Sequence, residues 1–285
     1  MMLKGGKMNL SEALKLAGSQ TAASWEENND TDTYLGQGND KYEHIYLQLN
    51  SIGEFLEEEN LLIDYFGRDA ITPYYLKKIE QGDIVVTEKD FASGEVPTMQ
   101  AILDKLGIDY SYNDYLECLH KYLHRKIWTD TLGNVKSSVL NGTRTQPIFI
   151  KPKDGLKKFT GFVLTGKNDF YKFKDAPDNM EVWCSDVVKF ISEYRIPVIN
   201  GEIRDCCYYV GEKTGLDMSV VESAVKDFKD CNKAYCIDFG VLSTGETALI
   251  EVNDAYSIGC YTMSQETYAE LLMTRWDELM ASKKA

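Results

Sequence analysis

The chain has 285 residues, of which 44% are hydrophobic and 12% aromatic, so it can bury a large core in one multi-part domain or in two domains. Its formal net charge of −14 argues against a general nucleic-acid binder and against a protein that adheres to anionic membranes. The sequence contains no apolar run of roughly 18 residues and no apolar stretch near its start, so we expect neither a membrane-spanning helix nor a secretory signal.

The seven cysteines indicate a reducing environment. Their number is odd, no C-x-x-C pair occurs, and most of them lie in apolar surroundings, as buried thiols do. A disulfide framework is therefore not expected, and the sequence predicts a cytoplasmic protein.

The first half of the chain predicts an arm followed by an α/β region. Residues 1–40 are polar and acidic and predict a poorly structured arm or loop. Residues 41–66 have apolar side chains at helical spacing and predict a helix, whereas "GDIVVTE" predicts a buried strand. Two more helices are predicted, from "VPTMQAILDKLGIDY", entered through Pro97 and ended at Gly107, and from residues 112–132.

The second half predicts mainly antiparallel strands, which makes the chain an α+β protein. Strands are predicted for "PIFIKPKDG", "FTGFVLTG" and "MEVWCSDVVKFI". The segment "SEYRIPVINGEIRDCCYYVG" predicts two strands joined by a turn at Asn200 and Gly201. A short helix from "SVVESAVKDFKDC" precedes the last hairpin, and a final helix begins at a cap on Ser264.

The last hairpin, residues 234–254, brings two acids together. We expect a two-residue loop centred on Thr244 and Gly245. The register that follows leaves one face wholly apolar, with the pairs Ile237–Val252, Phe239–Ile250 and Val241–Ala248. The other face carries Asp238 directly opposite Glu251, with Asn253 beyond them.

Opposed like charges destabilise a sheet, so this acid pair needs an explanation. Asp238 and Glu251 are tolerated if one of them is protonated, if a basic side chain intervenes, or if a cation lies between them. Two carboxylates and the amide oxygen of Asn253 form a hard-oxygen set that suits Mg²⁺. A solvated hairpin face that carries two acids is the alternative interpretation.

Basic residues in the same half can bind phosphate. Lys151 stands at the end of a buried strand, and Lys157 and Lys158 follow in a flexible loop. Each of these lysines also fits an ordinary basic surface turn. Arg195 lies among apolar residues at a strand start, where an arginine pairs with a phosphate or a carboxylate, and Glu193 is its nearest candidate in sequence.

The order of these segments resembles the ATP-grasp superfamily. The segments are "FIKP", "LKKFTG", "VWCSDVV", "EYRIPVINGEI" and "CIDFG…ALIEVND", and the resemblance covers roughly residues 120–262. It is strongest to a bacterial and phage clade defined by two lysines and one arginine. The resemblance implies an ATP-grasp fold in which two α+β subdomains clamp ATP, preceded by a divergent N-terminal α/β region.

The resemblance also implies roles for individual residues. Lys151 matches a strand-end lysine that contacts nucleotide phosphates, and Lys157, with Lys158 as the alternative, matches a loop lysine. Arg195 matches the arginine that meets the triphosphate, so Arg195 and Lys157 are the implied catalytic residues. The strand that pairs with adenine through its backbone is matched by Cys184, Ser185, Asp186, Val187 and Val188. The Mg²⁺ ligands are matched by Asp238, Glu251 and Asn253.

The implied activity is that of an ATP- and Mg²⁺-dependent carboxylate ligase. ATP phosphorylates the carboxylate of a small molecule or peptide, and an amine or similar nucleophile then attacks the acyl phosphate. The alternatives are a kinase-like ATP-grasp phosphotransferase and an ATP-binding interaction module without turnover. Substrate contacts are expected from the return strand, at Arg204 and Tyr208 with Tyr209 beside them, and further candidates are Arg68 and Arg125.

Four parts are expected along the chain. They are the arm over residues 1–40, the N-terminal α/β region over 41–118, a small lid subdomain over 119–180, and a C-terminal subdomain with the metal site over 181–285.

Overall fold

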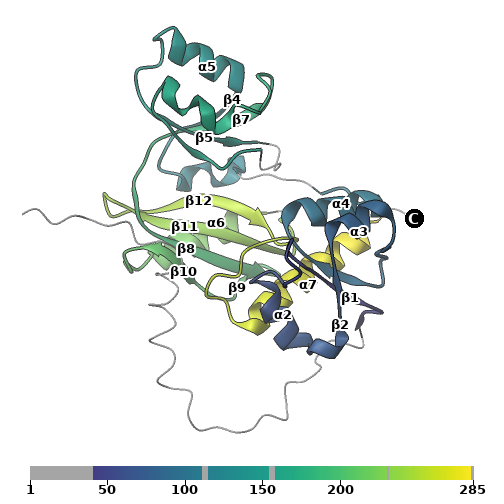
Figure 1. The fold of residues 1–285 in the computed structure, drawn as a ribbon. Helices are drawn as coiled ribbons and strands as arrows, with labels where there is room; N and C mark the ends of the chain where they lie inside the picture. The colour runs from purple at the N-terminus through teal and green to yellow at the C-terminus, as the bar shows by residue number, and fades with distance from the viewer. Residues whose placement is uncertain (1–40, 111–114, 154–157, 230, 284–285) are drawn as a thin grey trace, which may run out of the picture. The chain divides into compact units, whose positions relative to one another are not determined.

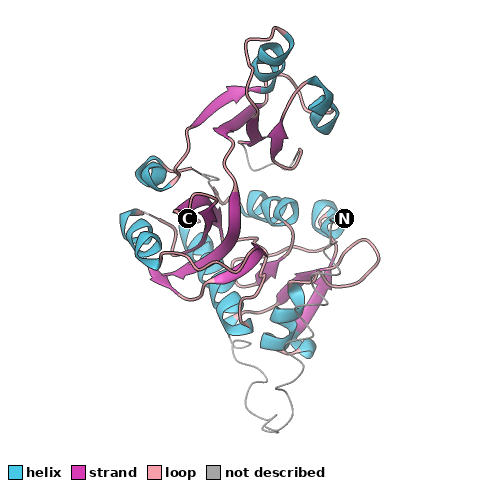
Figure 2. Ribbon diagram, turned by 90° about the vertical axis from the view of Figure 1, so that its left-hand side faces the viewer, coloured by secondary structure: helices cyan, strands magenta, loops and turns pink. Residues whose placement is uncertain are grey.

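The computed structural model describes residues 41–110, 115–153, 158–229 and 231–283, which all belong to the same compact unit. The arm expected over residues 1–40 lies outside this range. Figures 1 and 2 show the helices and strands of the described residues. None of these helices has both the length and the apolar composition that crossing a membrane requires.

The first sheet is parallel and has three short strands in the order β2-β1-β3. Parallel neighbours need crossover connections, and helices supply them here. The elements are β1 (Ile45–Gln48), α2 (Glu59–Phe66), β2 (Ile71–Tyr74), α3 (Leu76–Gln81), β3 (Phe91–Ser93) and α4 (Val96–Leu106). The predicted helix that ends at Gly107 is confirmed, because Gly107 is left-handed and its N–H bonds back to α4.

Two predictions in this region are wrong. The helix predicted over residues 41–66 forms only at α2, because β1 occupies its beginning and a turn follows. In that turn the Asn50 side chain accepts hydrogen bonds from the N–H groups of Ile52 and Glu54, and Gly53 has a φ of 86°. The strand predicted from "GDIVVTE" is absent, since Gly82 ends α3 in a left-handed conformation and pairing with β1 begins later, at β3.

The second sheet is antiparallel, in the order β4-β7-β5-β6. Its elements are β4 (Ile127–Thr131), α5 (Leu132–Leu140), β5 (Ile148–Pro152), β6 (Phe162–Leu164) and β7 (Glu181–Asp186). The helix predicted over residues 112–132 is wrong. A 3-10 helix, Glu117–Tyr122, ends just before His124, which has a φ of 50°, and the β-branched and aromatic run that follows forms β4.

The second sheet extends past the subdomain limit expected at residue 180. β7 is a central strand of this sheet and ends at Asp186, and β8 of the next sheet begins at Phe190. We therefore propose that the lid and C-terminal subdomains meet in the connection 187–189.

The third sheet has five strands and holds the predicted hairpin. Its order is β10-β8-β11-β12, with β9 paired to β8. The turn at Asn200 and Gly201 is confirmed, since both residues have positive φ, as a type I′ hairpin requires. The elements are β8 (Phe190–Ile199), β9 (Glu202–Ile203), β10 (Cys207–Gly211), α6 (Met218–Asp227), β11 (Ala234–Leu242), β12 (Thr247–Asp254) and α7 (Gln265–Ser282).

Helix α7 connects the cores of the first and third sheets. Its cap is the predicted one, because the Ser264 hydroxyl accepts a hydrogen bond from the Thr267 N–H. Trp276 is buried, donates to the Asp90 carbonyl at 2.7 Å and packs edge-on against Phe91 of β3. The other face of α7 contacts β8 and β11, so the helix fixes the large sheet against the parallel one.

The β11–β12 hairpin confirms the pairing of the acids but corrects the turn. Asp238 lies opposite Glu251, as expected. The loop has three residues, 243–245, rather than two, and Gly245 has a φ of 101°. The extra loop residue shifts the pairing of Phe239 from Ile250 to Leu249, and a bulge at Ile250 restores the expected register before the acids are reached.

Candidate functional site

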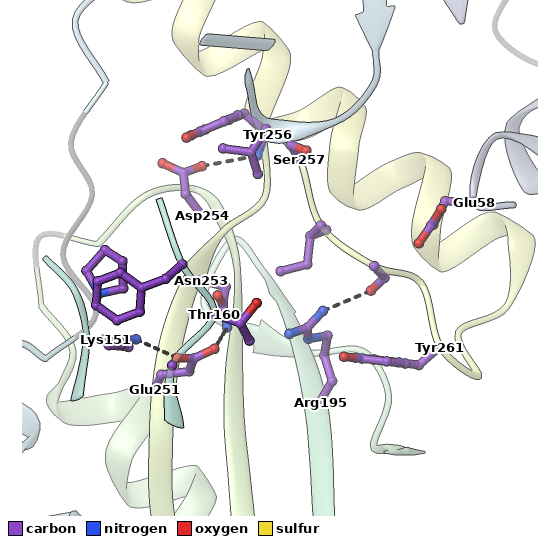
Figure 3. Close-up of a pocket in the computed structure, with 16 residues that line it drawn as sticks. Glu58, Lys151, Thr160, Arg195, Glu251, Asn253, Asp254, Tyr256, Ser257 and Tyr261 are labelled. Atoms are coloured by element: carbon purple, nitrogen blue, oxygen red, sulfur yellow. Dashed lines mark hydrogen bonds and ion pairs between the residues drawn. The ribbon is translucent and has the colours of Figure 1, made fainter. Parts of the chain in front are cut away.

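Four charged side chains form a row that crosses the large sheet and ends at Lys151 of the second sheet. Arg195 of β8, Asp238 of β11 and Glu251 of β12 are cross-strand neighbours in that order. Arg195 donates from Nε to Asp238 Oδ1 at 3.0 Å and from Nη2 to Asp238 Oδ2 at 2.7 Å. Lys151, at the end of β5, donates to Glu251 Oε2 at 2.6 Å (Figure 3). The row therefore reads cation, anion, anion, cation and has no net charge.

This row explains why two opposed acids are tolerated. Each acid has its own basic partner, and Asn253 donates from Nδ2 to one oxygen of each acid at 3.2 Å. Arg195 does form an ion pair, but its partner is Asp238, which faces it directly across the ladder, and not Glu193, the nearest candidate in sequence. Glu193 instead accepts a hydrogen bond from the Tyr209 hydroxyl at 2.8 Å.

Three members of the row are buried and Glu251 is partly buried, so water screens their charges only weakly. Lys151, Arg195 and Asp238 are 9%, 7% and 1% exposed. Burial raises the pKa of the Asp238 carboxyl to about 6, against the opposing effect of Arg195. Burial also tends to raise the pKa of Glu251, but the charge and hydrogen bond of Lys151 outweigh it and hold that pKa below its ordinary value. Arg195 and Lys151 thus each favour the charged form of the carboxyl group that they contact.

A cavity of about 480 Å³ opens beside the row. The Arg195 guanidinium lies 4.6 Å from the centre of the Tyr261 ring and donates from Nη1 to the Gly259 carbonyl at 3.1 Å. A β-carbon on Gly161 would lie 2.7 Å from Phe149 and 3.0 Å from Lys151, so only glycine lets this segment approach β5 so closely. The cavity is lined by three members of the charged row, Lys151, Arg195 and Glu251, and by Glu58, Thr160, Gly161, Ser257, Gly259 and Tyr261.

Only some of the lysines expected to bind phosphate belong to the described residues. Lys157 lies outside the described residues. Lys158 is exposed, and the next three residues, 159–161, line the cavity. Lys151 lines it as well and lies 4.7 Å from the centre of the Tyr115 ring.

Only part of the segment expected to bind adenine has backbone groups that the sheet does not use. Cys184, Ser185 and Asp186 belong to β7, which pairs with β4 on one side and β5 on the other. Their backbone groups are therefore used by the sheet, and the Asp186 N–H donates to the Lys126 carbonyl. Val187 and Val188 follow outside the ladder, and Val187 is exposed.

The expected substrate contacts lie elsewhere. Arg204 donates to Glu270 of α7 at 2.8 Å, the Tyr208 hydroxyl donates to the Gly211 carbonyl, and neither residue lines the cavity beside the row. Arg68 lies over the Phe55 ring. Arg125 donates to the carbonyls of Leu249 and Ile250 at 2.7 and 2.8 Å, so it supports the bulge.

The lining residues that the sequence missed come mainly from the segment after β12. Gly259 and Tyr261 stand in "AYSIGCYTM", and Glu58 comes from the start of α2. Neither stretch has a periodicity or spacing that distinguishes a binding loop from a surface loop. The one usable signal in the sequence is that this segment connects the strand that carries Asn253 to the helix capped by Ser264.

The side chains offer a partial metal site. Glu251 Oε1 accepts from Asn253 Nδ2, so turning the Asn253 amide would present two hard oxygens to a cation. Asp238 does not fit in this arrangement, because both of its oxygens accept from Arg195. Among the described residues, no three or more His, Cys, Asp or Glu side chains are grouped as a metal site.

Comparison with known proteins identifies the family. A family model described as an ATP-grasp domain, family 2 of its clade, matches residues 122–271, which is more than half of the chain. The chain belongs to this ATP-grasp family. The ATP-grasp fold predicted from the sequence is therefore confirmed, whereas the assignment of two lysines and one arginine to a clade signature stays a prediction.

Solved structures with related architecture are distant from this ATP-grasp protein. D-alanine–D-alanine ligase from Bacillus anthracis, complexed with ATP, is 14% identical with a TM-score of 0.46, over 85% of this chain and 99% of that one. An ATP-grasp RimK domain protein from Sphaerobacter thermophilus is 9% identical with a TM-score of 0.46, over 84% and 99%. N5-carboxyaminoimidazole synthetase from Staphylococcus aureus, with ADP, is 12% identical with a TM-score of 0.37, over 87% and 75%. The search of curated proteins gave no significant match.

Proposed function

We propose that this protein is an ATP- and Mg²⁺-dependent ligase that joins a carboxylate to an amine. The observation that carries the proposal is the neutral row of Arg195, Asp238, Glu251 and Lys151 at the edge of the cavity. Two cationic side chains that reach the same cavity suit a triphosphate, and Glu251 beside Lys151 suits its metal ion.

Binding of a nucleotide would exchange the partners within the row. The phosphates bring negative charge to Lys151 and Arg195, which already line the cavity. Once Lys151 turns to phosphate, Glu251 Oε2 becomes available, and Glu251 and Asn253 are the residues that would hold Mg²⁺. Mg²⁺ would neutralise charge that develops on the transferring phosphoryl group. A second phosphate contact is proposed for Lys157, with Lys158 as the alternative.

The proposed reaction proceeds in two displacements. A carboxylate oxygen of the first substrate attacks the γ-phosphorus of ATP, and the bond to ADP breaks. The amine, which gives up its ammonium proton to the medium before it reacts, then attacks the acyl carbon with its lone pair, inorganic phosphate leaves, and the nitrogen loses a further proton as the amide forms. The protein supplies no covalent nucleophile in this scheme. Its contribution is to position the reactants and stabilise charge.

A test separates the ligase from its alternatives. ADP release is measured with panels of carboxylic acids, first alone and then with amines. A ligase releases ADP only when a suitable acid and amine are combined. Release with an accumulating phosphorylated product would instead indicate a phosphotransferase, and nucleotide binding without ADP release across the panels would indicate an interaction module.

A further inference from the structure

A second cavity, of about 400 Å³, lies at the carboxyl edge of the parallel sheet. Ser93 ends β3, and Gly94 and Glu95 follow it directly. The crevice outside the carboxyl ends of the strands is where open α/β sheets bind ligands. Glu58 and Glu59, at the start of α2, and Glu95 all line this cavity, and none of its described lining residues is basic.

Glu59 is an unusual member of this acidic group. It is 2% exposed, and its Oε2 has no hydrogen-bond partner among the described residues. Burial raises the pKa of the Glu59 carboxyl to about 8, against the lowering effect of the neighbouring Ser93 side chain and Gln48 backbone. A buried acceptor without a partner is unfavourable, so a donor that enters the cavity would be stabilised by this oxygen.

The second cavity joins the one beside the charged row. Both are lined by Glu58, Val96, Ser257, Ile258 and Gly259. A β-carbon on Gly259 would lie 3.5 Å from Arg195 Nη1 and 3.7 Å from Glu58 Oε1. Gly259 thus lies directly between Arg195, the arginine proposed to bind phosphate, and Glu58 of the acidic group.

We propose that the second cavity binds the acceptor substrate through a protonated amine, with the Glu58 carboxylate and the unpartnered carboxyl oxygen of Glu59 as its hydrogen-bond acceptors and Glu95 at the rim. This inference rests on the proposed ligase function, because the neighbouring cavity must hold the activated acid. An ammonium group has three N–H donors, which matches a site with several acceptors and no basic side chain. A carboxylate would be repelled from the same place.

The test uses n-butylammonium as the probe and the full chain. Its binding is titrated by saturation-transfer NMR to the wild type and to Glu59→Gln and Glu95→Gln. Glu57→Gln is the matched control, since Glu57 is the exposed neighbour that does not line the cavity. We expect Glu59→Gln to weaken binding about tenfold and Glu57→Gln to leave it unchanged. Glu95 is exposed, so Glu95→Gln should keep the fold and show a smaller loss.

Two further probes decide between specific and diffuse attraction. Tetramethylammonium carries the same charge without N–H donors, and butyrate carries the opposite charge. Weaker binding of both supports the proposal. Equal binding of tetramethylammonium, preference for butyrate, or unchanged affinity in Glu59→Gln would overturn it.

ATP binding, followed in the same samples, separates this inference from the function it rests on. Unchanged n-butylammonium affinity in Glu59→Gln, with ATP binding retained, would overturn only the amine site. Failure of the wild type to bind ATP would overturn the ligase and with it the acceptor role.

Discussion

Lys151 and Glu251 are 100 residues apart in the sequence, yet Lys151 Nζ lies 2.6 Å from Glu251 Oε2. The contact joins β5 of the four-stranded sheet to β12 of the five-stranded sheet. The two side chains are 11% and 26% exposed, so water does little to screen their attraction. The same lysine that we propose for phosphate binding therefore also holds two sheets together before a nucleotide arrives.

Replacing Lys151 tests both roles at once. Lys151→Met should abolish ADP release and lower the free energy of unfolding by about 1–3 kcal/mol, because Glu251 loses its charged partner. The double variant Lys151→Met with Glu251→Gln should regain most of the stability and none of the activity. Urea unfolding and ADP assays measure the two effects. A Lys151→Met protein as stable as the wild type would contradict the structural role.

Arg195→Ala should be more damaging to stability. Asp238 is 1% exposed and accepts two hydrogen bonds from Arg195, so the variant leaves a buried carboxylate without a counter-charge. We expect a loss of about 3–5 kcal/mol, seen as a lower urea midpoint. Arg204→Ala is the control, because its ion pair with Glu270 is partly exposed and should contribute no more than about 1 kcal/mol. Similar losses in the two variants would contradict the assignment.

Glu59 should make stability fall as pH rises. In the unfolded chain this carboxyl ionises near 4.5, whereas in the fold it keeps its proton to about 8. Unfolding between these values releases a proton, so the stabilising contribution is complete below about 4.5 and is lost as pH rises through about 8. Urea midpoints of Glu59→Gln should show a flatter pH dependence than those of the wild type and Glu57→Gln. Parallel curves for all three proteins would refute the assignment.

Glu251→Gln tests the proposed metal ligand. For the wild type, removing Mg²⁺ with a chelator should weaken ATP binding about tenfold or more. For Glu251→Gln the affinity should be low and nearly independent of Mg²⁺, because the variant lacks the anionic ligand. Calorimetric titrations with and without Mg²⁺ measure the difference. A variant that keeps the full response to Mg²⁺ would place the metal elsewhere.

Competition between nucleotides tests the adenine site. We propose that the adenine edge pairs with backbone groups at Val187 and Val188, which follow β7 outside its ladders. GTP presents the opposite order of donor and acceptor and should displace ATP at least about tenfold less well. A displacement assay with a fluorescent ATP analogue measures the ratio. Equal displacement by the two nucleotides would exclude this placement.

The sequence predicts the part of the site that depends on the alternation of side chains within one hairpin. It does not predict the contacts that depend on which distant strands pair. The side-chain period of two placed Asp238 opposite Glu251 from the hairpin alone. The partner of Arg195 required knowledge that β8 lies beside β11, and no local pattern carries that information. The sequence therefore offered Glu193 as the nearest carboxylate candidate, which is near in the chain but does not lie opposite Arg195 in the sheet.

Short strands, and cavities formed by segments far apart in the chain, could not be predicted from the sequence for related reasons. β1 has four residues, too few for alternation to outweigh the helical spacing of the apolar side chains around it. The acidic cavity combines Glu59 of α2, Ser93 of β3 and Gly259 after β12, which meet only in the folded chain. Helices with strong end signals, such as the one that ends at Gly107, were the easiest elements to predict.

The bulge at Ile250 makes the pairing of the acids independent of the length of the hairpin loop, while the Ser243 N–H donates to the Lys189 carbonyl beside the proposed adenine contacts. The extra residue in the loop would otherwise carry Glu251 to the apolar face, and the bulge absorbs that shift before it reaches the acids. Arg125 donates hydrogen bonds to the carbonyls of Leu249 and Ile250 at the bulge. The loop residues Ser243, Thr244 and Gly245 are exposed. The tip can therefore accept a grafted peptide or a fluorescent label, which makes it a handle for attaching the protein to a surface without altering the charged row.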